Sequence, residues 1–300
     1  MSSIIWFKLA QYTASRINMQ SCRPIVCFCA LCYSGCMKAI ANYHTHTQLC
    51  KHAQGVPIDY VRQAVKEGCT ALGFSDHCPY DGRFEDTWPH IRMSPDEAPL
   101  YAEQVRQAKA EAPFPVYLGF ECEYDARYRG WYEDELKGRF GAEYLVLGSH
   151  WVTAGSRHVY CPEIDSPALL NRYIDQTIDG MRSGLFAFVA HPDLFMSGWK
   201  EWDSQAQSCL SALLDAAIDL DLPVEVNGLG ITRRPNDTSR GMRYMYPYLE
   251  FWEMAAQSKA RVICNSDAHD PHDVIMNAWR ARDFAGRFGI TPVEAACLIR

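Results

Sequence analysis

The sequence predicts an α/β fold, a seven-stranded (β/α) barrel, from three observations. Short apolar runs alternate with helical patterns along most of the 300 residues, which predicts βαβ units and a parallel sheet. Hydrophobic residues make up 48% of the chain, enough to fill a large core. Polar side chains suited to chemistry follow the apolar runs, as at the carboxyl ends of barrel strands. Because no repeat, low-complexity tract or linker interrupts this pattern, we expect one domain over residues 37–300.

The first 36 residues do not fit the pattern. An apolar, cysteine-containing stretch at 25–36 follows several basic residues. It has the length of the apolar part of a signal peptide, but it is too short to cross a membrane as a helix. The alternative is that Met37 is the native start and that residues 1–36 are an upstream extension outside the native protein. We favour this interpretation, because the first strand then begins at once.

The strands are expected from apolar runs that end in polar residues. The first run ends in His44-Thr45-His46. Residues two apart on a strand point to the same side, so these two imidazoles can bind the same metal ion. The seven predicted strands are 39–46, 70–77, 115–123, 143–151, 186–191, 223–227 and 261–269.

Helices are expected between these strands. Pro57 opens one, since proline is tolerated in the first turn of a helix. Ser94 is a suitable cap for another, because Pro95 and two acidic residues follow it. The other predicted helices are 166–182, 204–219, 241–258 and 271–284.

Every predicted strand ends in a side chain that can bind a metal ion or is strongly polar. In a barrel these ends lie on one face, where barrel active sites are built. Imidazole combined with carboxylate favours zinc, iron or manganese over magnesium or calcium. Seven of the ten histidines lie in or just after these strand ends, as scattered surface histidines would not. They are His44, His46, His52, His77, His150, His191 and His269, and the accompanying carboxylates and amide are Glu121, Glu225, Asn227 and Asp267.

The composition restricts the class of partner. A formal net charge of −7 argues against a general nucleic-acid binder, although metal ions can still attract an anionic substrate. Thirteen cysteines in a long acidic chain predict mostly reduced thiols, and we expect a cytoplasmic protein without membrane association. The sequence has no Gly-x-Ser-x-Gly elbow, phosphate-binding loop or dinucleotide fingerprint. A covalent serine route is therefore not indicated.

The strand ends form six short motifs with a definite order and spacing. They are His44-Thr45-His46-Thr47-x-x-Cys50-x-His52, Phe74-Ser75-Asp76-His77-x-Pro79, Gly119-x-Glu121, Ser149-His150, His191-Pro192-Asp193 and Ser266-Asp267-Ala268-His269. Together they resemble the polymerase and histidinol phosphatase (PHP) superfamily, from about Asn42 to His269. The motifs around Cys50, Asp76, Glu121 and His191 are most similar to those of the histidinol-phosphatase branch.

This resemblance implies a distorted (β/α)7 barrel with two or three divalent transition-metal ions, zinc, manganese or iron, on its C-terminal face. Glu121, Asp267 and His191 are the expected catalytic residues, and Glu121 is expected to bridge two ions. All nine ligand positions of the family carry a suitable residue. The first ion would be held by His44, His46, Glu121 and Asp267, the second by Glu121, His150 and His191, and the third by His52, His77 and His269.

Further residues are candidates for binding the substrate or supporting the ligands. Glu225 and Asn227 are expected to hold either a substrate amine or a ligand. Asp76 and Asp193 are expected either to orient ligand histidines or to cap the helices that follow. An arginine fork suits two phosphate oxygens, although a loop arginine is usually only solvated. The candidates for gripping a phosphate are Arg157, His158, Arg233 and Arg234.

The implied function is hydrolysis of a small phosphate monoester by a metal-activated hydroxide. Histidinol phosphate, cleaved to histidinol and phosphate in histidine biosynthesis, is the favoured substrate. The alternative is a nuclease or nucleotide phosphoesterase on the same scaffold. A metal-binding regulatory barrel is a third possibility, which the complete ligand set disfavours. The acidic balance and the lack of a basic groove favour a small phosphorylated partner over nucleic acid or a membrane.

Overall fold

The computed structural model describes residues 39–81, 89–155 and 157–294. The chain separates into two units, Met1–Met37 and Lys38–Arg300. The first unit lies outside the described residues, so the predicted extension 1–36 stays a prediction. The second unit contains the whole barrel.

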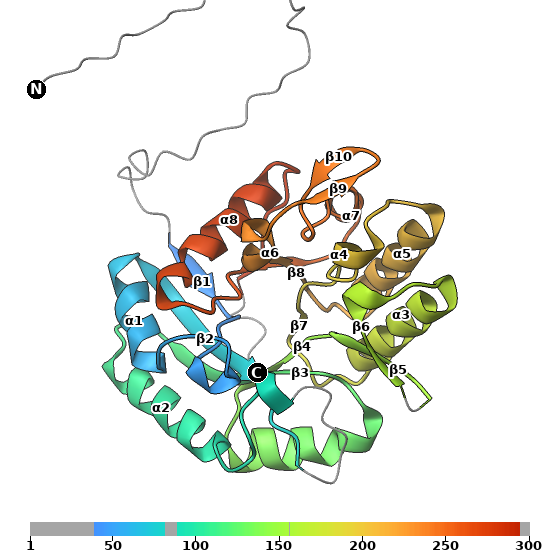
Figure 1. Cartoon of the computed structure of the whole chain (residues 1–300). Helices are drawn as coiled ribbons and strands as arrows, with labels where there is room; N and C mark the ends of the chain where they lie inside the picture. Colours follow the sequence, from blue (N-terminus) through green and yellow to red (C-terminus); the bar gives the residue numbers. More distant parts are fainter. Residues whose placement is uncertain (1–38, 82–88, 156, 295–300) are drawn as a thin grey trace, which may run out of the picture. The chain divides into compact units, whose positions relative to one another are not determined.

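Seven parallel strands form the barrel sheet in the order β1-β2-β3-β4-β7-β8-β11 (Figure 1). Each lies within or next to one of the predicted runs, and each barrel strand pairs with the next barrel strand along the chain, as in an α/β barrel. The strands are β1 Ile40–Asn42, β2 Cys69–His77, β3 Val116–Cys122, β4 Tyr144–Leu147, β7 Phe188–Val189, β8 Val224–Asn227 and β11 Val262–Asn265.

The barrel nearly closes through the residues that follow its first and last strands. Thr45 and Ala268 form an isolated parallel bridge, and the His46 amide donates to the Ala268 carbonyl at 2.9 Å. Both segments lie beyond β1 and β11, which end earlier than predicted. The backbone that carries His46 is therefore the same backbone that closes the barrel, and the distorted seven-stranded barrel is confirmed.

Helices cover the outside of the sheet (Figure 1). The α5 helix begins after Asp203, whose side chain accepts from the Ala206 amide at 2.8 Å, a standard N-cap. Among the described residues, no helix is long and apolar enough to cross a membrane. The longer helices are α1 Pro57–Lys66, α2 Ala98–Glu111, α3 Pro167–Arg182, α5 Ser204–Asp219, α7 Leu249–Ala256 and α8 Met276–Gly286, and the shorter ones are α4 Met196–Trp199 and α6 Gly228–Thr232.

Three helix predictions were wrong in extent. The helix predicted over 271–284 begins only at Met276, after a short 3-10 helix (η7) over Pro271–Asp273. The α2 helix begins at Ala98 rather than at Ser94, because the Ser94 amide instead donates to the Glu97 carboxylate at 2.8 Å within a turn. The predicted helix 241–258 is helical only over Leu249–Ala256. Its first part belongs to a hairpin of β9 Asn236–Thr238 and β10 Gly241–Arg243. Gly241 has a positive φ of 87°, which suits a turn and not a helix.

The connection between β4 and α3 also differs from the prediction. The strand expected over 143–151 ends at Leu147, and the chain continues into an antiparallel hairpin of β5 Trp151–Ala154 and β6 Arg157–Tyr160. Between β3 and β4, a π-helix (η5) over Trp131–Arg139 was not predicted. The hairpin packs on α3, where the Gln176 side chain accepts from the Thr153 amide at 3.0 Å.

A small cluster of buried side chains packs together below the polar strand ends. The Tyr144 hydroxyl donates to the Tyr43 carbonyl at 2.8 Å. Gly73 and Gly119 provide the space for this ring, since an added Cβ would lie 2.3 and 2.5 Å from Tyr144 atoms. The cluster supports the functional side chains from below and comprises Ala41, Tyr43, Ala71, Tyr144, Val146, Phe188, Ala190 and Ile263.

Candidate metal centre

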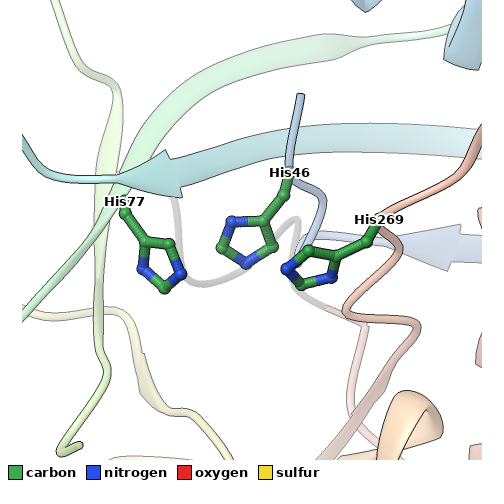
Figure 2. Close-up of side chains that lie close together, drawn as sticks. All are labelled: His46, His77 and His269. Carbon is green, nitrogen blue, oxygen red and sulfur yellow. The ribbon is translucent and has the colours of Figure 1, made fainter. Parts of the chain in front are cut away.

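The predicted ligands gather at the carboxyl ends of the barrel strands. They come from segments far apart in the chain, and Figure 2 shows three of them, His46, His77 and His269, lying side by side. Most are buried: His44, His46, His77, Glu121, His191 and Asp267 are each at most 7% exposed. The structure therefore places the nine residues in one polar cluster inside the barrel mouth.

Glu121 lies at the middle of this cluster and faces histidines with both oxygens. Its Oε1 lies 2.9 Å from His191 Nε2 and 3.5 Å from His150 Nε2. Its Oε2 lies 3.0 Å from His77 Nδ1 and 3.5 Å from His46 Nε2. A carboxylate in this position can bridge two ions, one on each side.

Asp267 faces Glu121 across the His-x-His pair. Its Oδ1 lies 3.2 Å from His46 Nε2 and 3.5 Å from His44 Nε2. The two imidazole Nε2 atoms are themselves 3.2 Å apart. These four residues are those predicted for the first ion, and their ligand atoms converge on a common point.

The remaining histidines form the outer part of the cluster. The Nε2 atoms of His52 and His269 lie 3.0 Å apart, and Cys50 Sγ lies 3.9 Å from His52 Nε2. The His77 ring is 5.4 Å from that of His52, but its Nδ1 points to Glu121. His77 therefore stands between the groups predicted for the first and third ions.

The arrangement fits divalent cations. Ligands about 2.1 Å from one ion stand roughly 3 Å from one another, which is the spacing between the facing nitrogens and oxygens here. Two buried carboxylate oxygens, Glu121 Oε2 and Asp267 Oδ1, accept no hydrogen bond from any described residue. Buried polar atoms are normally paired. Oxygens that face imidazole nitrogens without a donor are suited to a shared ion.

The electrostatics favour positive charge at this place. Burial alone would lower the pKa of His44, yet Glu225, Asp267 and Glu121 outweigh it and raise that pKa well above its usual value. Burial would raise the pKa of Glu121, but the surrounding histidines hold it well below its usual range. Burial and the nearby His46 lower the pKa of His269 to about 3. Despite burial, the neighbouring histidines likewise hold the pKa of Asp267 well below its usual range, so Glu121 and Asp267 are ionised, and His269 is neutral and able to act as a ligand.

Glu225 orients His44 from behind. Its Oε1 lies 2.9 Å from His44 Nδ1, and its Oε2 accepts from the His191 amide at 3.1 Å and the Asn227 amide group at 2.9 Å. Asn227 also donates to Asp267 Oδ2 at 3.0 Å. Glu225 is completely buried. Of the two roles expected for Glu225 and Asn227, these contacts fit the support of ligands rather than the binding of a substrate amine.

Two other carboxylates support histidines in a similar way. Asp76 accepts from the Thr47 amide at 3.1 Å, and its Oδ1 lies 3.5 Å from His46 Nδ1. Glu123 Oε1 lies 2.7 Å from His150 Nδ1. Sequence reasoning assigned no role to Glu123. The signal was present, because Glu123 lies two residues beyond Glu121 and thus on the same side of an extended chain.

Asp193 has a different role from those expected. Its Oδ2 accepts from the Tyr248 amide at 2.6 Å and from Trp252 Nε1 at 3.0 Å. Burial raises its pKa to about 6. Asp193 therefore holds the start of α7 against the segment after β7, and it caps a helix other than the one that follows it directly.

The four phosphate candidates lie in two places. Arg233 and Arg234 are exposed after α6. Arg233 is close to the hydroxyl of Tyr246, whose pKa burial raises and Arg233 partly lowers, and the Tyr246 ring is 6.3 Å from that of His191. His158 lies in β6, where its Nδ1 is 3.1 Å from Thr153 Oγ1. Arg157 begins the same strand.

Sequence reasoning missed Arg92. Its side chain is only 3% exposed, and its Nη1 donates to the Cys78 carbonyl at 3.1 Å, next to His77. The pKa of His150 is raised, because the carboxylates of Glu121 and Glu123 outweigh the lowering effect of burial. Arg92 is near enough to His150 to oppose this rise. No motif marks this arginine, because it reaches the site from a loop outside the strand ends.

Two of the expected catalytic residues have left-handed backbone conformations. The φ angle is 29° at His191 and 50° at Asp267. Such conformations are costly for residues with a Cβ and cluster at functional sites. The backbone at Gly148 passes close to a third expected catalytic residue, because an added Cβ there would lie 2.3 Å from Glu121 Oε1. The backbone is shaped to bring these side chains together.

The chain is similar in sequence to curated proteins named histidinol-phosphatase. The "Probable histidinol-phosphatase" of Deinococcus radiodurans is 27% identical over 252 residues, covering 79% of this chain and 89% of the relative. The "Histidinol-phosphatase" of Bacillus subtilis is 23% identical, covering 77% of this chain and 94% of the relative.

Solved structures show the same fold. A histidinol phosphate phosphatase from Lactococcus lactis, crystallised with zinc, L-histidinol and phosphate, superposes with a TM-score of 0.62 at 15% identity, covering 84% of this chain and 95% of that one. The model of the PHP domain family matches residues 42–228, a range that holds seven of the nine predicted ligands and lacks only Asp267 and His269. The chain belongs to the PHP domain family.

Proposed function

We propose that this chain is a metal-dependent phosphatase of a small phosphate monoester, with histidinol phosphate as the favoured substrate. The observation that carries the proposal is the cluster around Glu121, where imidazole nitrogens face both carboxylate oxygens at 2.9–3.6 Å. The names of the relatives support the reaction class and the substrate.

The predicted ligands would hold two or three divalent ions, zinc, manganese or iron. Once bound, such ions activate water and neutralise charge on a phosphate. Two carboxylates of the chain hold ligand imidazoles in an orientation that suits metal binding. Glu225 and Glu123 contact the Nδ1 atoms of His44 and His150, so that each Nε2 faces Glu121. Such outer contacts set the tautomer and the ring orientation of ligand histidines.

The serines near the centre support direct attack by water. Ser75 Oγ accepts from the Thr45 amide at 3.3 Å, and Ser266 Oγ donates to the His44 carbonyl at 3.0 Å. Both side chains are fully buried and hold backbone segments together. A serine nucleophile needs an adjacent base to activate it, whereas these two hydroxyls form hydrogen bonds with backbone groups.

A panel of phosphoesters tests the proposed function. The metal-replete chain is incubated with histidinol phosphate, glycerol 3-phosphate, a nucleoside monophosphate and a dinucleotide diester, and phosphate release is measured. We expect the highest kcat/KM with histidinol phosphate. Cleavage of the diester in preference to all monoesters would instead support the nuclease alternative.

A further inference from the structure

A cavity of about 260 Å³ lies next to the metal centre, on the far side of His150 from Glu121. Its lining residues come from the segments after β2, β3 and β4, from the β5–β6 hairpin and from α3. The hairpin and α3 lie side by side in Figure 1. None of the nine predicted ligands is among the described residues that line it. The cavity is thus a separate compartment that borders the centre.

One imidazole ring connects the two compartments. His150 Nε2 lies 3.5 Å from Glu121 in the centre, and its Nδ1 lies 2.7 Å from Glu123. Glu123 in turn lines the cavity, and so does Ser149, the residue before His150. The wall of the cavity therefore lies one imidazole ring away from Glu121.

The chemistry of the walls selects a cationic group. Among the described residues, three carboxylates line the cavity, those of Glu123, Asp125 and Asp179, beside a single arginine, Arg127. Partial burial opposes ionisation of Asp125, but its bonds with Arg127 lower its pKa, so it stays charged. The aromatic lining residues are Tyr80, Tyr124, Tyr128 and Trp151. Aromatic faces and carboxylates together bind ammonium and imidazolium groups.

We propose that this cavity is the subsite for the leaving alcohol of the substrate, and that it selects phosphate monoesters whose alcohol carries a cationic amine or imidazole. The inference rests on the proposed function and adds the part of the chain that selects the substrate. His158 lines this cavity beside Asp125. We accordingly assign it to the alcohol rather than to the phosphate.

Two variants test the subsite without touching the centre. Ala126 is exposed and lines the cavity within η4 Ala126–Tyr128, so Ala126→Trp narrows the opening while the core stays intact. Asp125→Asn removes one charge and keeps an oxygen for the Arg127 amide, which the native side chain caps at 2.8 Å. The control is Glu103→Gln, which removes an equal charge on the exposed face of α2.

Kinetics with two esters give the first readout. For histidinol phosphate, Ala126→Trp should raise KM by about tenfold and Asp125→Asn by several-fold, as expected for loss of one cation contact. For glycerol 3-phosphate, whose alcohol is neutral, both variants should keep the wild-type KM and kcat. Glu103→Gln should change neither ester. Equal effects on both esters, or no effect on histidinol phosphate, would overturn the subsite.

Calorimetric titration separates the subsite from the proposed function. L-histidinol should bind the wild-type chain about tenfold more tightly than Ala126→Trp, while inorganic phosphate should bind both equally. This result supports the subsite even if no ester is hydrolysed, an outcome that would refute the proposed function alone. Hydrolysis of histidinol phosphate with unchanged KM in both variants would refute the subsite and leave the function standing. Circular dichroism of each variant verifies folding.

Discussion

The Nδ1 atom of His44 lies 2.9 Å from Oε1 of Glu225, and both side chains are completely buried. This contact points the other nitrogen of His44 toward Glu121, at 3.6 Å from its Oε2. Glu225 has no exposed surface with which to meet a substrate. Its burial next to an imidazole is explained by the need to hold that imidazole in one orientation.

Glu225→Gln should weaken metal binding. The substitution keeps the shape but removes the charge that fixes His44, and loss of such an outer carboxylate typically costs about 10- to 100-fold in metal affinity. The measurement is the metal content of the chain at equilibrium with a competing chelator. Glu201→Gln, at an exposed carboxylate bonded to Ser239, is the control. Unchanged affinity in Glu225→Gln would show that His44 needs no such support.

Glu121→Gln should cut turnover by about 10³-fold, the effect of losing a principal electrostatic contact. An amide cannot provide two anionic oxygens to the histidines on either side. The measurement is kcat for the preferred monoester at saturating metal, alongside the bound metal per chain. Activity within tenfold of the wild type would remove Glu121 from the middle of the proposed mechanism.

Arg233→Ala should raise KM for a phosphate monoester by about 10- to 100-fold, the cost of losing a hydrogen bond to a charged group, with little change in kcat. Arg233 is the arginine beside the Tyr246 hydroxyl, and the Tyr246 ring lies 6.3 Å from that of His191. Arg234→Ala is the neighbouring comparison and should have the smaller effect. A larger rise in KM for Arg234→Ala would show that Arg234, rather than Arg233, binds the phosphate. Arg157→Ala stays a prediction from the sequence, with the same expected rise in KM.

Hydrolysis should invert the configuration at phosphorus. The hydroxyls of Ser75 and Ser266 are bonded to backbone groups, so we expect one direct displacement by water. A chiral phosphate ester reports the outcome, since one displacement inverts and two displacements retain configuration. Retention would demonstrate a phosphoenzyme and a nucleophile among the side chains.

Much of the fold could be predicted because the barrel strands are continuous apolar runs. The exception at 143–151 has a tertiary cause. The run looks like a single strand, but the backbone at Gly148 passes so close to Glu121 that a Cβ has no room, and the chain leaves the sheet there. Local pattern carries no trace of this contact. The hairpin before α7 was missed because the predicted helix was begun at Gly241. This glycine has a positive φ of 87° and begins β10 instead.

The candidate site was predicted in part for the same reason. His44, His77 and Asp267 lie within short motifs at strand ends, and such motifs can be recognised in the sequence alone. Arg92 reaches the site from a loop, so its role is not visible without the fold. The spacing of Glu123 from Glu121 places it on the same side of the chain, but only the fold shows that it contacts His150. The φ angles of His191 and Asp267 likewise follow from the tertiary arrangement.

The most direct test is a metal titration of the chain. The protein is stripped with a chelator, and zinc, manganese or iron is returned stepwise. Bound ions per chain and phosphate release from histidinol phosphate are measured in the same samples. We expect two or three ions to bind and activity to appear only as the second ion binds. Full activity in the stripped protein, or fewer than one bound ion per chain after reconstitution, would contradict the proposed metal centre.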